Sequence, residues 1–192
     1  MKNNLNAFVI ANPNRCIGCR TCEIACALAH LEGNPLSEGT DDFQFNQRLN
    51  VIKTATVSSP IQCRHCEDAP CANVCPVGAI VRKNNTIQIN NQICIGCKNC
   101  LLACPFGAID FITEYVNGKK NIQENLKIVE NSNMYNKERI IANKCDLCIG
   151  RENGPACVEV CPTNALRLVK PNMLVNSIKE KRKKVTTALP FI

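Results

Sequence analysis

The sequence contains no tryptophan, and aromatic residues make up only 4% of its 192 residues. Because aromatic side chains supply much of the apolar area that an ordinary core buries, something else must fill the interior. No segment approaches the run of about 18 apolar residues that spans a bilayer, and the first residues lack the apolar stretch and cleavage pattern of a signal peptide. We therefore expect a cytoplasmic protein without a transmembrane segment.

Familiar catalytic motifs are also absent. The chain has no nucleophile–base motif, no glycine-rich phosphate loop and no flavin or nicotinamide fingerprint. It also lacks the combination of aromatic and basic residues that stacks on and neutralises single-stranded nucleic acid. These absences favour a protein that is not itself an enzyme and that has no nucleic-acid partner.

Cysteine is abundant, with sixteen residues in four groups of four. The first group is Cys16, Cys19, Cys22 and Cys26, and the second is Cys63, Cys66, Cys71 and Cys75. The third group is Cys94, Cys97, Cys100 and Cys104, and the fourth is Cys145, Cys148, Cys157 and Cys161. Sixteen thiolates match four cubane [4Fe–4S] clusters with four ligands each. Their ligation would supply much of the folding free energy, so we expect the iron-free chain to be largely unfolded.

The formal net charge of +7 changes meaning once the cysteines bind iron. That count treats cysteine as neutral, whereas a ligating cysteine is a thiolate. With sixteen thiolates and four oxidised cores the net charge becomes about −1. Cysteines at this density in a reducing compartment indicate metal ligands rather than disulfides. The basic residues therefore compensate for the clusters and do not indicate nucleic-acid binding.

The spacing within the groups favours iron–sulfur clusters over zinc. The first and third groups read C-x2-C-x2-C-x3-C, a run in which three cysteines hold one cubane and the fourth holds the other cluster of a pair. Zinc sites use two widely separated Cys-x2-4-Cys hooks instead. The second and fourth groups read C-x2-C-x4-C-x3-C-P and C-x2-C-x8-C-x3-C-P, and the fourth could hold zinc if it stood alone.

Each group predicts a repeated unit: a cysteine loop, a short helix that carries the fourth cysteine, and a strand. Gly18 and Gly96 lie within Cys-x2-Cys turns, where the backbone needs left-handed conformations. A proline follows the fourth cysteine of the second, third and fourth groups and should end the helix there. The segment from Ala79 to Ile89 predicts a β-hairpin with its turn around Asn84 and Asn85.

The spacers between the groups predict which groups share clusters. Only 18 residues, Pro76 to Ile93, separate the second group from the third, so we expect these two groups to form one two-cluster module and the first and fourth to form the other. The central clusters would be held by Cys63, Cys66, Cys71 and Cys104 (cluster 2) and by Cys75, Cys94, Cys97 and Cys100 (cluster 3). The outer clusters would be held by Cys16, Cys19, Cys22 and Cys161 (cluster 1) and by Cys26, Cys145, Cys148 and Cys157 (cluster 4).

This pairing predicts an α+β fold of two tandem two-cluster modules with the clusters as its core. The parts would be residues 6–61 with 140–170 (outer module), 62–112 (central module), 113–139 (a polar linker or insertion) and 171–192 (a C-terminal helix and tail). Residues 30–47 contain two glycines and a proline, which predicts a loop.

Two stretches carry a resemblance to a known family. Gln62 to Ile80 reads QCRHCEDAPCANVCPVGAI, and Asn143 to Thr163 contains NKCDLC, GPAC and CPT. They resemble the iron–sulfur electron-transfer subunits of molybdenum/tungsten oxidoreductases and of formate hydrogenlyase systems, most closely the HydN/HycB-type ferredoxin-like proteins. The resemblance covers about residues 6–169 and implies that the modules are bacterial-ferredoxin-like and form a double ferredoxin with four clusters paired as above. Some relatives replace one cysteine and hold a [3Fe–4S] centre, but all sixteen cysteines are present here.

Side chains beside the cysteines are candidates for tuning the clusters. Each group is complete with four thiolates, so we expect neither His30 nor His65 to be a ligand, and we expect His65 to donate a hydrogen bond near its cluster instead. Four basic residues adjoin cysteines: Arg20, Arg64, Lys98 and Lys144. Positive charge near sulfur raises a reduction potential, but ordinary solvated charge explains these four residues equally well.

The sequence favours an electron-transfer subunit. It would relay single electrons between a formate dehydrogenase-type molybdenum or tungsten enzyme and a hydrogenase or other redox partner. A free polyferredoxin, an accessory protein for the maturation of such enzymes, and a current-carrying filament are the alternatives. The basic run Lys179–Lys184 and the apolar tail Leu189–Ile192 are candidates for docking or higher assembly, although a basic run is more often a solvated helix end.

Overall fold

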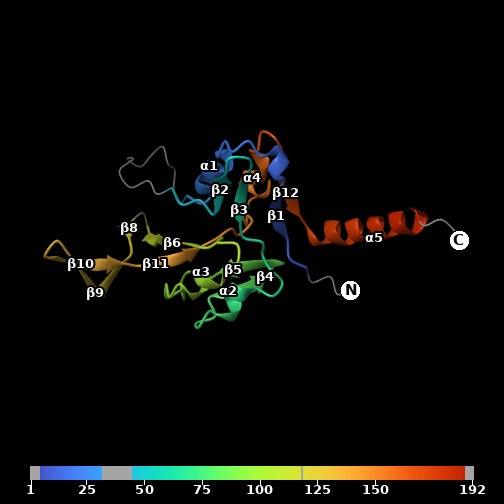
Figure 1. Cartoon of the computed structure of the whole chain (residues 1–192). Helices are drawn as coiled ribbons and strands as arrows, with labels where there is room; N and C mark the ends of the chain where they lie inside the picture. The colour runs from blue at the N-terminus through green and yellow to red at the C-terminus, as the bar shows by residue number, and fades with distance from the viewer. Residues whose placement is uncertain (1–4, 32–44, 118, 189–192) are drawn as a thin grey trace.

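The structure, a computed structural model, describes residues 5–31, 45–117 and 119–188. All sheets within these residues are antiparallel ribbons of two strands, so the fold is an α+β arrangement of short elements (Figure 1). The predicted loop at residues 30–47 lies mostly outside the described residues, and the predicted apolar tail Leu189–Ile192 lies wholly outside them.

Short strands and helices alternate along the chain. The strands are β1 (Phe8–Ala11), β2 (Leu49–Lys53), β3 (Ser58–Gln62), β4 (Ile80–Lys83), β5 (Thr86–Ile89), β6 (Asp110–Thr113), β7 (Tyr115–Val116), β8 (Lys119–Lys120), β9 (Ile122–Glu130), β10 (Asn133–Glu138), β11 (Ile140–Asn143) and β12 (Leu166–Val169). The helices are the 3-10 helix η1 (Pro13–Arg15) and the α-helices α1 (Thr21–Leu28), α2 (Pro70–Asn73), α3 (Asn99–Ala103), α4 (Ala156–Glu159) and α5 (Pro171–Ala188). Apart from α1 and α5, each described helix is about one turn long.

The first and last cysteine units lie side by side. β1 pairs with β12, so that Phe8 is opposite Val169, and α1 contacts α4. Figure 1 shows the blue N-terminal elements next to the orange elements that precede α5. These contacts bring the first cysteine group to the fourth, although the other two groups lie between them in the sequence.

The β4–β5 hairpin forms as predicted. Its register places Lys83 opposite Thr86. Asn84 and Asn85 have φ values of 53° and 57°, the left-handed pair that a two-residue type I′ turn requires. α2 and α3, which contact each other, flank this hairpin in the sequence, so the second and third cysteine groups lie together.

One ribbon links the third cysteine group to the fourth. β6, which follows the third group, pairs with β11, which precedes the fourth. The backbone of β11 comes so close to the third-group loop that a Cβ at Gly96 would lie 2.7 Å from the carbonyl oxygen of Ile140. Arg139, just before β11, donates a hydrogen bond to the carbonyl oxygen of Cys94 at 2.9 Å. The third-group loop is therefore fixed against the strand that leads to the fourth group.

Residues 113–139 fold into two further ribbons. β7 pairs with β8, and β9 pairs with β10 through a two-residue turn at Asn131 and Ser132, whose φ values are 48° and 65°. The β9–β10 ribbon projects from the body of the protein (Figure 1). The polar composition of this segment predicts a linker and not strands. The ribbon that forms buries little apolar area, since Val129 and Met134, which lie opposite each other in it, are both exposed.

The short helices differ from the predicted units in one respect. Only α1 carries the fourth cysteine of its group, Cys26. The helices α2, α3 and α4 each carry the third cysteine of their group and end before the fourth. The three cysteines beyond a helix end are Cys75, Cys104 and Cys161. Each precedes a proline, which disfavours a helical conformation for the residue before it, while Ala27 takes that position in the first group. The prediction that the helix carries the fourth cysteine was therefore wrong for three groups.

Cysteine and alanine make up most of the buried apolar residues. Of the 25 buried hydrophobic residues in the described ranges, eight are cysteines, seven are alanines and none is aromatic. They form two clusters, one with Cys22, Cys26, Cys63, Cys145 and Cys157 and the other with Cys71, Cys94 and Cys100. The interior is thus built around sulfur atoms, as the shortage of aromatic residues predicts.

The predicted C-terminal helix is present as α5. No residue of α5 is buried, and the helix extends away from the rest of the molecule (Figure 1). Across residues 5–31, 45–117 and 119–188, no helix combines the length and apolar character that crossing a membrane requires.

We expect Gly96 to tolerate a side chain less well than Gly107. Both have positive φ, 66° and 57°, so alanine at either position should cost about 1–2 kcal/mol of backbone strain. A Cβ at Gly107 would meet nothing within 4 Å, whereas one at Gly96 would meet the Ile140 carbonyl. Gly96→Ala should therefore lower the free energy of unfolding by about 1–3 kcal/mol more than Gly107→Ala does. Denaturant unfolding followed by circular dichroism under anaerobic conditions checks this, and equal losses would contradict the close contact.

Candidate metal centres

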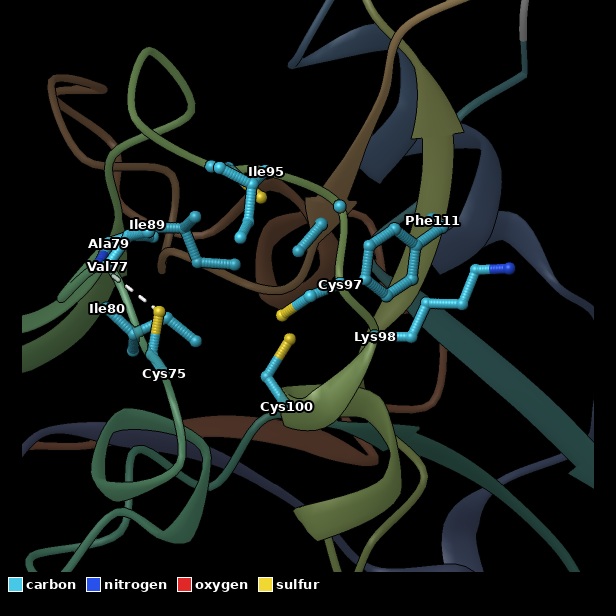
Figure 2. Close-up of a pocket in the computed structure, with 13 residues that line it drawn as sticks. Cys75, Val77, Ala79, Ile80, Ile89, Ile95, Cys97, Lys98, Cys100 and Phe111 are labelled. Carbon is cyan, nitrogen blue, oxygen red and sulfur yellow. Dashed lines mark hydrogen bonds between the residues drawn. The ribbon is translucent and has the colours of Figure 1, made fainter.

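One pocket is lined by four cysteines from two groups. They are Cys75 of the second group and Cys94, Cys97 and Cys100 of the third, the residues predicted to hold cluster 3. Figure 2 shows the sulfur atoms of Cys97 and Cys100 directed toward each other, with Cys75 across the pocket from them. Apolar side chains such as Ile89 and Phe111 complete the lining. The pocket therefore offers a set of soft sulfur ligands in apolar surroundings.

A second pocket lies where the first and fourth groups meet. Its cysteines are Cys16, Cys19, Cys22 and Cys161, the residues predicted to hold cluster 1. The Thr21 hydroxyl donates a hydrogen bond to the Cys19 sulfur at 3.4 Å, and this bond is the main cause that lowers the pKa of Cys19. A lowered pKa favours the thiolate, which is the form that binds metal.

Four of the remaining cysteines lie close together beside α2. Burial, followed by the charge of Cys63, raises the pKa of Cys66, and the same two causes raise the pKa of Cys71 to about 11. Cys104 of the third group adds to both shifts. Cysteines from the second and third groups therefore share this part of the interior, and they are the residues predicted to hold cluster 2.

The last four cysteines lie where α1 meets α4. Burial is the main cause that raises the pKa of Cys157, followed by the charges of Cys145, Cys26 and Cys148. These are the residues predicted to hold cluster 4. Burial also raises the pKa of Cys145. A buried thiol with a raised pKa is protonated at neutral pH, so Cys145 and Cys157 become thiolates only when a positive metal centre compensates their charge.

A backbone amide donates a hydrogen bond to the fourth cysteine of every group. In three groups the donor is an alanine four residues later: Ala79 to Cys75 at 3.3 Å, Ala108 to Cys104 at 3.5 Å and Ala165 to Cys161 at 3.2 Å. In the first group the N–H of Arg48 donates to Cys26 at 3.3 Å instead. Such bonds stabilise a ligating sulfur and tune the cluster that it holds. Sequence analysis missed these donors, although the repeated Cys-Pro-x-x-Ala pattern signals three of them.

His30 lies beside cysteines of the cluster 4 set, but other partners occupy its ring. Its Nδ1 lies 2.7 Å from the carbonyl oxygen of Cys26 and its Nε2 3.0 Å from Asp146, whose other oxygen accepts from Arg48 at 2.6 Å. Burial alone would lower the pKa of His30, but the hydrogen bonds to Asp146, Cys148 and Cys26 together outweigh burial, and the pKa rises to about 11. His30, Asp146 and Cys148 lie close enough together to hold an ion, yet a protonated imidazole has no free lone pair for a metal.

His65 is 1% exposed and offers a buried donor. Its Nδ1 accepts a hydrogen bond from the N–H of Ile87 at 3.0 Å, which places the ring proton on Nε2. Burial, followed by the charge of Lys144, lowers the pKa of His65 to about 3. Nε2 has no hydrogen-bond partner among the described residues. An unpaired buried donor is costly, and a cluster sulfur is an acceptor that would satisfy it.

The four basic residues next to cysteines differ in their surroundings. Arg20 and Lys98 are exposed, and Arg64 donates a hydrogen bond to the carbonyl oxygen of Val9 at 3.2 Å. Lys144 is only 4% exposed. The sequence leaves cluster tuning and solvated charge as equal alternatives. Burial rules out solvated charge for Lys144, whereas exposure favours it for Arg20 and Lys98.

The donor set as a whole fits iron–sulfur clusters. The two pockets each combine cysteines from two groups, as a paired dicluster arrangement requires. Sulfur ligands alone select iron–sulfur clusters, zinc or copper(I). The backbone N–H groups that donate to the cysteine sulfurs suit a cluster, whose ligating sulfurs accept hydrogen bonds. When bound, such clusters accept and release one electron each.

Comparison with known proteins identifies a family. Two family models match the chain, both described as a 4Fe-4S dicluster domain. One matches residues 54–128, and the other matches twice, over residues 15–79 and 93–165. The two matches of the second model together include all sixteen cysteines.

Three proteins of Escherichia coli strain K12 are similar over most of their length. The electron transport protein HydN is 43% identical over 187 residues, which cover 97% of this chain and 100% of HydN. Formate hydrogenlyase subunit 2 is 42% identical over 188 residues, covering 93% of this chain and 89% of that subunit. Hydrogenase-4 component A is 38% identical over 192 residues, covering 93% and 90%. With its repeated dicluster domain and these full-length relatives, the chain belongs to the HydN-type family of 4Fe-4S dicluster iron–sulfur proteins.

Proposed function

We propose that the chain is an electron-transfer subunit that holds four [4Fe–4S] clusters and passes single electrons between redox enzymes. The four clusters have the ligand sets defined above as clusters 1 to 4. The observation that carries the proposal is the meeting of cysteines from different groups, both in the two pockets and in the two buried sets. Ligation by four cysteines leaves no iron position open to a substrate, which suits a carrier rather than an enzyme.

Contacts among the cysteines support a linear order of clusters: 1, 4, 2, 3. After burial, which is the main cause, Cys22 of cluster 1 contributes to the raised pKa of Cys157 in cluster 4. Cys63 of cluster 2 likewise contributes to the raised pKa of Cys145 in cluster 4. Cys71 of cluster 2 belongs to the same hydrophobic cluster as Cys94 and Cys100 of cluster 3. These three relations support the proposed order.

Both ends of this order reach the surface. Cys19 of cluster 1 and Cys97 of cluster 3 are the two exposed cysteines, while the other fourteen are buried or partly buried. An exposed isoleucine, Ile17 or Ile95, lies near each of them. Exposed apolar residues beside a redox centre suit a contact with another protein, so electrons would enter at one end and leave at the other.

The same contacts support a double ferredoxin. The outer module would comprise residues 6–61 and 140–170, the central module residues 62–112, and the insertion residues 113–139. β1–β12 pairing and the contact between α1 and α4 support the outer module. One dicluster match spans the second and third groups, as this pairing requires. The other matches each span two consecutive groups, so paired cysteine substitutions are the direct test of the ligand sets.

The names of the relatives support the choice of partners. Proteins named as a formate hydrogenlyase subunit and a hydrogenase component favour a formate dehydrogenase-type molybdenum or tungsten enzyme at one end and a hydrogenase at the other. The projecting α5, with its basic run Lys179–Lys184, is the candidate for higher assembly. A free polyferredoxin would use the same clusters without a fixed complex, and an accessory protein would act only during maturation.

Anaerobic purification of the protein from its own cells tests the proposal. We expect about sixteen irons and sixteen acid-labile sulfides per chain, together with co-purifying subunits of a molybdenum or tungsten enzyme and of a hydrogenase. About four zinc ions in their place would refute the cluster assignment. Recovery of the chain alone, fully loaded with iron, would favour the polyferredoxin. A chain that ends at Lys170 and still assembles completely would remove α5 from the docking site.

A further inference from the structure

Lys144 is the one lysine or arginine that is buried in the described part of the chain. It immediately precedes Cys145, the first cysteine of the fourth group. Its ammonium donates hydrogen bonds to the carbonyl oxygen of Ile87 and to that of Cys145, the latter at 2.9 Å. A lysine adjacent to a cysteine of the fourth group thus reaches a strand of the hairpin between the second and third groups.

The backbone of Ile87 fixes two charged or polar side chains at this place. Its carbonyl oxygen accepts from Lys144, and its N–H donates to Nδ1 of His65 at 3.0 Å. His65 belongs to the second cysteine group and Lys144 adjoins the fourth. The ammonium is therefore held at the junction where a cysteine loop of cluster 2 meets a cysteine loop of cluster 4.

No carboxylate among the described residues forms an ion pair with Lys144. The nearest acidic residue in the sequence, Asp146, is taken by Arg48 at 2.6 Å and by His30 at 3.0 Å. A buried cation without a counter-charge is strongly unfavourable. The two carbonyl oxygens satisfy two of its three N–H donors but supply no negative charge, so the counter-charge must come from another group.

Thiolates of two different clusters are the groups that can supply it. Lys144 donates to the carbonyl oxygen of Cys145, which belongs to the cluster 4 set, at 2.9 Å. Through the backbone of Ile87 it also adjoins His65, whose own N–H donates to the sulfur of Cys63 in the cluster 2 set at 3.4 Å. The ammonium is therefore held between a ligand of cluster 2 and a ligand of cluster 4.

We propose that the ammonium of Lys144 is the shared counter-charge of clusters 2 and 4 and raises the reduction potentials of both. The inference rests on the proposed four-cluster function. Reduction adds one negative charge to a cluster, and a fixed positive charge nearby stabilises that reduced state. Burial alone disfavours the extra negative charge of a reduced cluster. The positive charge of Lys144 offsets this cost at clusters 2 and 4, where the path of electrons is most enclosed. An electron that leaves cluster 4 for cluster 2 stays beside the same ammonium.

Potentiometric titration of the loaded, full-length protein tests this role, with electron paramagnetic resonance as the readout. Lys144→Gln removes the charge and keeps a hydrogen-bond donor, and Lys144→Met removes both. We expect two of the four one-electron waves to move to lower potential in each variant. A tenfold change in the reduction equilibrium, about 59 mV for one electron, is the expected size. Lys144→Arg keeps the charge and should restore both waves.

Lys98→Met is the matched control, because Lys98 also adjoins a cysteine but is exposed. Solvent screens its charge, so we expect a much smaller shift, confined to one wave. Four unchanged waves in Lys144→Gln would overturn the proposal, and so would an equal shift of all four. A shift in Lys144→Arg as large as that in Lys144→Gln would also overturn it, because the side chain would then act through its shape.

Iron content separates failure of this inference from failure of the proposed function. Wild-type protein without iron–sulfur clusters would end both, whereas intact clusters with unaltered potentials in Lys144→Gln would end only the role of Lys144. Should both neutral variants fail to hold iron while Lys144→Arg retains it, the positive charge is required to assemble clusters 2 and 4, as expected of their counter-charge. Loss of iron in Lys144→Arg as well would count against the charge.

Discussion

Removing the iron should abolish the cooperative folding of this chain. Eight of the 25 buried hydrophobic residues in the described part of the chain are cysteines and seven are alanines, so little apolar area holds the interior together without the clusters. Metal binding contributes about 10–16 kcal/mol to folding in small structural zinc domains, which matches the whole stability of a typical domain, about 5–15 kcal/mol. The four proposed clusters, each of which would join two distant segments, should contribute at least as large a share.

Anaerobic chelation followed by circular dichroism and calorimetry measures this effect. We expect the heat-absorption peak to disappear and the strand signal to be lost, while α5 leaves some helical signal that melts without cooperativity. Addition of iron and sulfide should restore the peak, which shows that chelation did not damage the chain. A cooperative, native-like transition in the cluster-free protein would contradict the expectation and would mean that the short ribbons are stable by themselves.

The sequence predicts those features of the fold that depend on chemistry local to a few residues. The turn at Asn84 and Asn85 and the left-handed glycines at Gly18 and Gly96 appear as expected, with φ of 71° and 66° for the two glycines. Each of these residues is chosen for one backbone conformation, so its identity carries the information. For the same reason the prolines after the cysteines end the helices, although the helices end before the fourth cysteine and do not include it.

Features that depend on distant partners could not be predicted. His65 has a left-handed backbone conformation, with φ of 48°. Glycine occupies the same position of the Cys-x2-Cys turn in the first and third groups, but the histidine does not by itself indicate this conformation. The N–H of Arg48 replaces the alanine donor of the other groups because β2 passes Cys26, and no local pattern signals this approach. In the sequence, Lys144 is one of four basic residues that adjoin cysteines, and only its burial in the structure distinguishes it from the other three.

Paired cysteine substitutions should show which cysteines share a cluster. If Cys75 is a ligand of cluster 3, Cys75→Ser combined with Cys97→Ser damages one cluster and leaves about twelve irons per chain. Cys71→Ser combined with Cys75→Ser then damages clusters 2 and 3 and leaves about eight irons. If each group of four holds its own cluster instead, the two iron contents are exchanged. The pocket shared by Cys75 and Cys97 favours the first result.

The comparison is sharp because both double variants remove two cysteines and share Cys75→Ser, so general loss of stability affects them alike. Single variants provide the reference: losses that add indicate separate clusters, and losses that do not add indicate one. The outer pairing is tested in the same way by Cys161→Ser with Cys19→Ser against Cys161→Ser with Cys157→Ser. Iron and sulfide analysis of anaerobically purified protein gives the counts. Cross-ligation makes each cysteine both a ligand and a link between segments, so the chain would depend on the same sixteen residues for its fold and for its path of electrons.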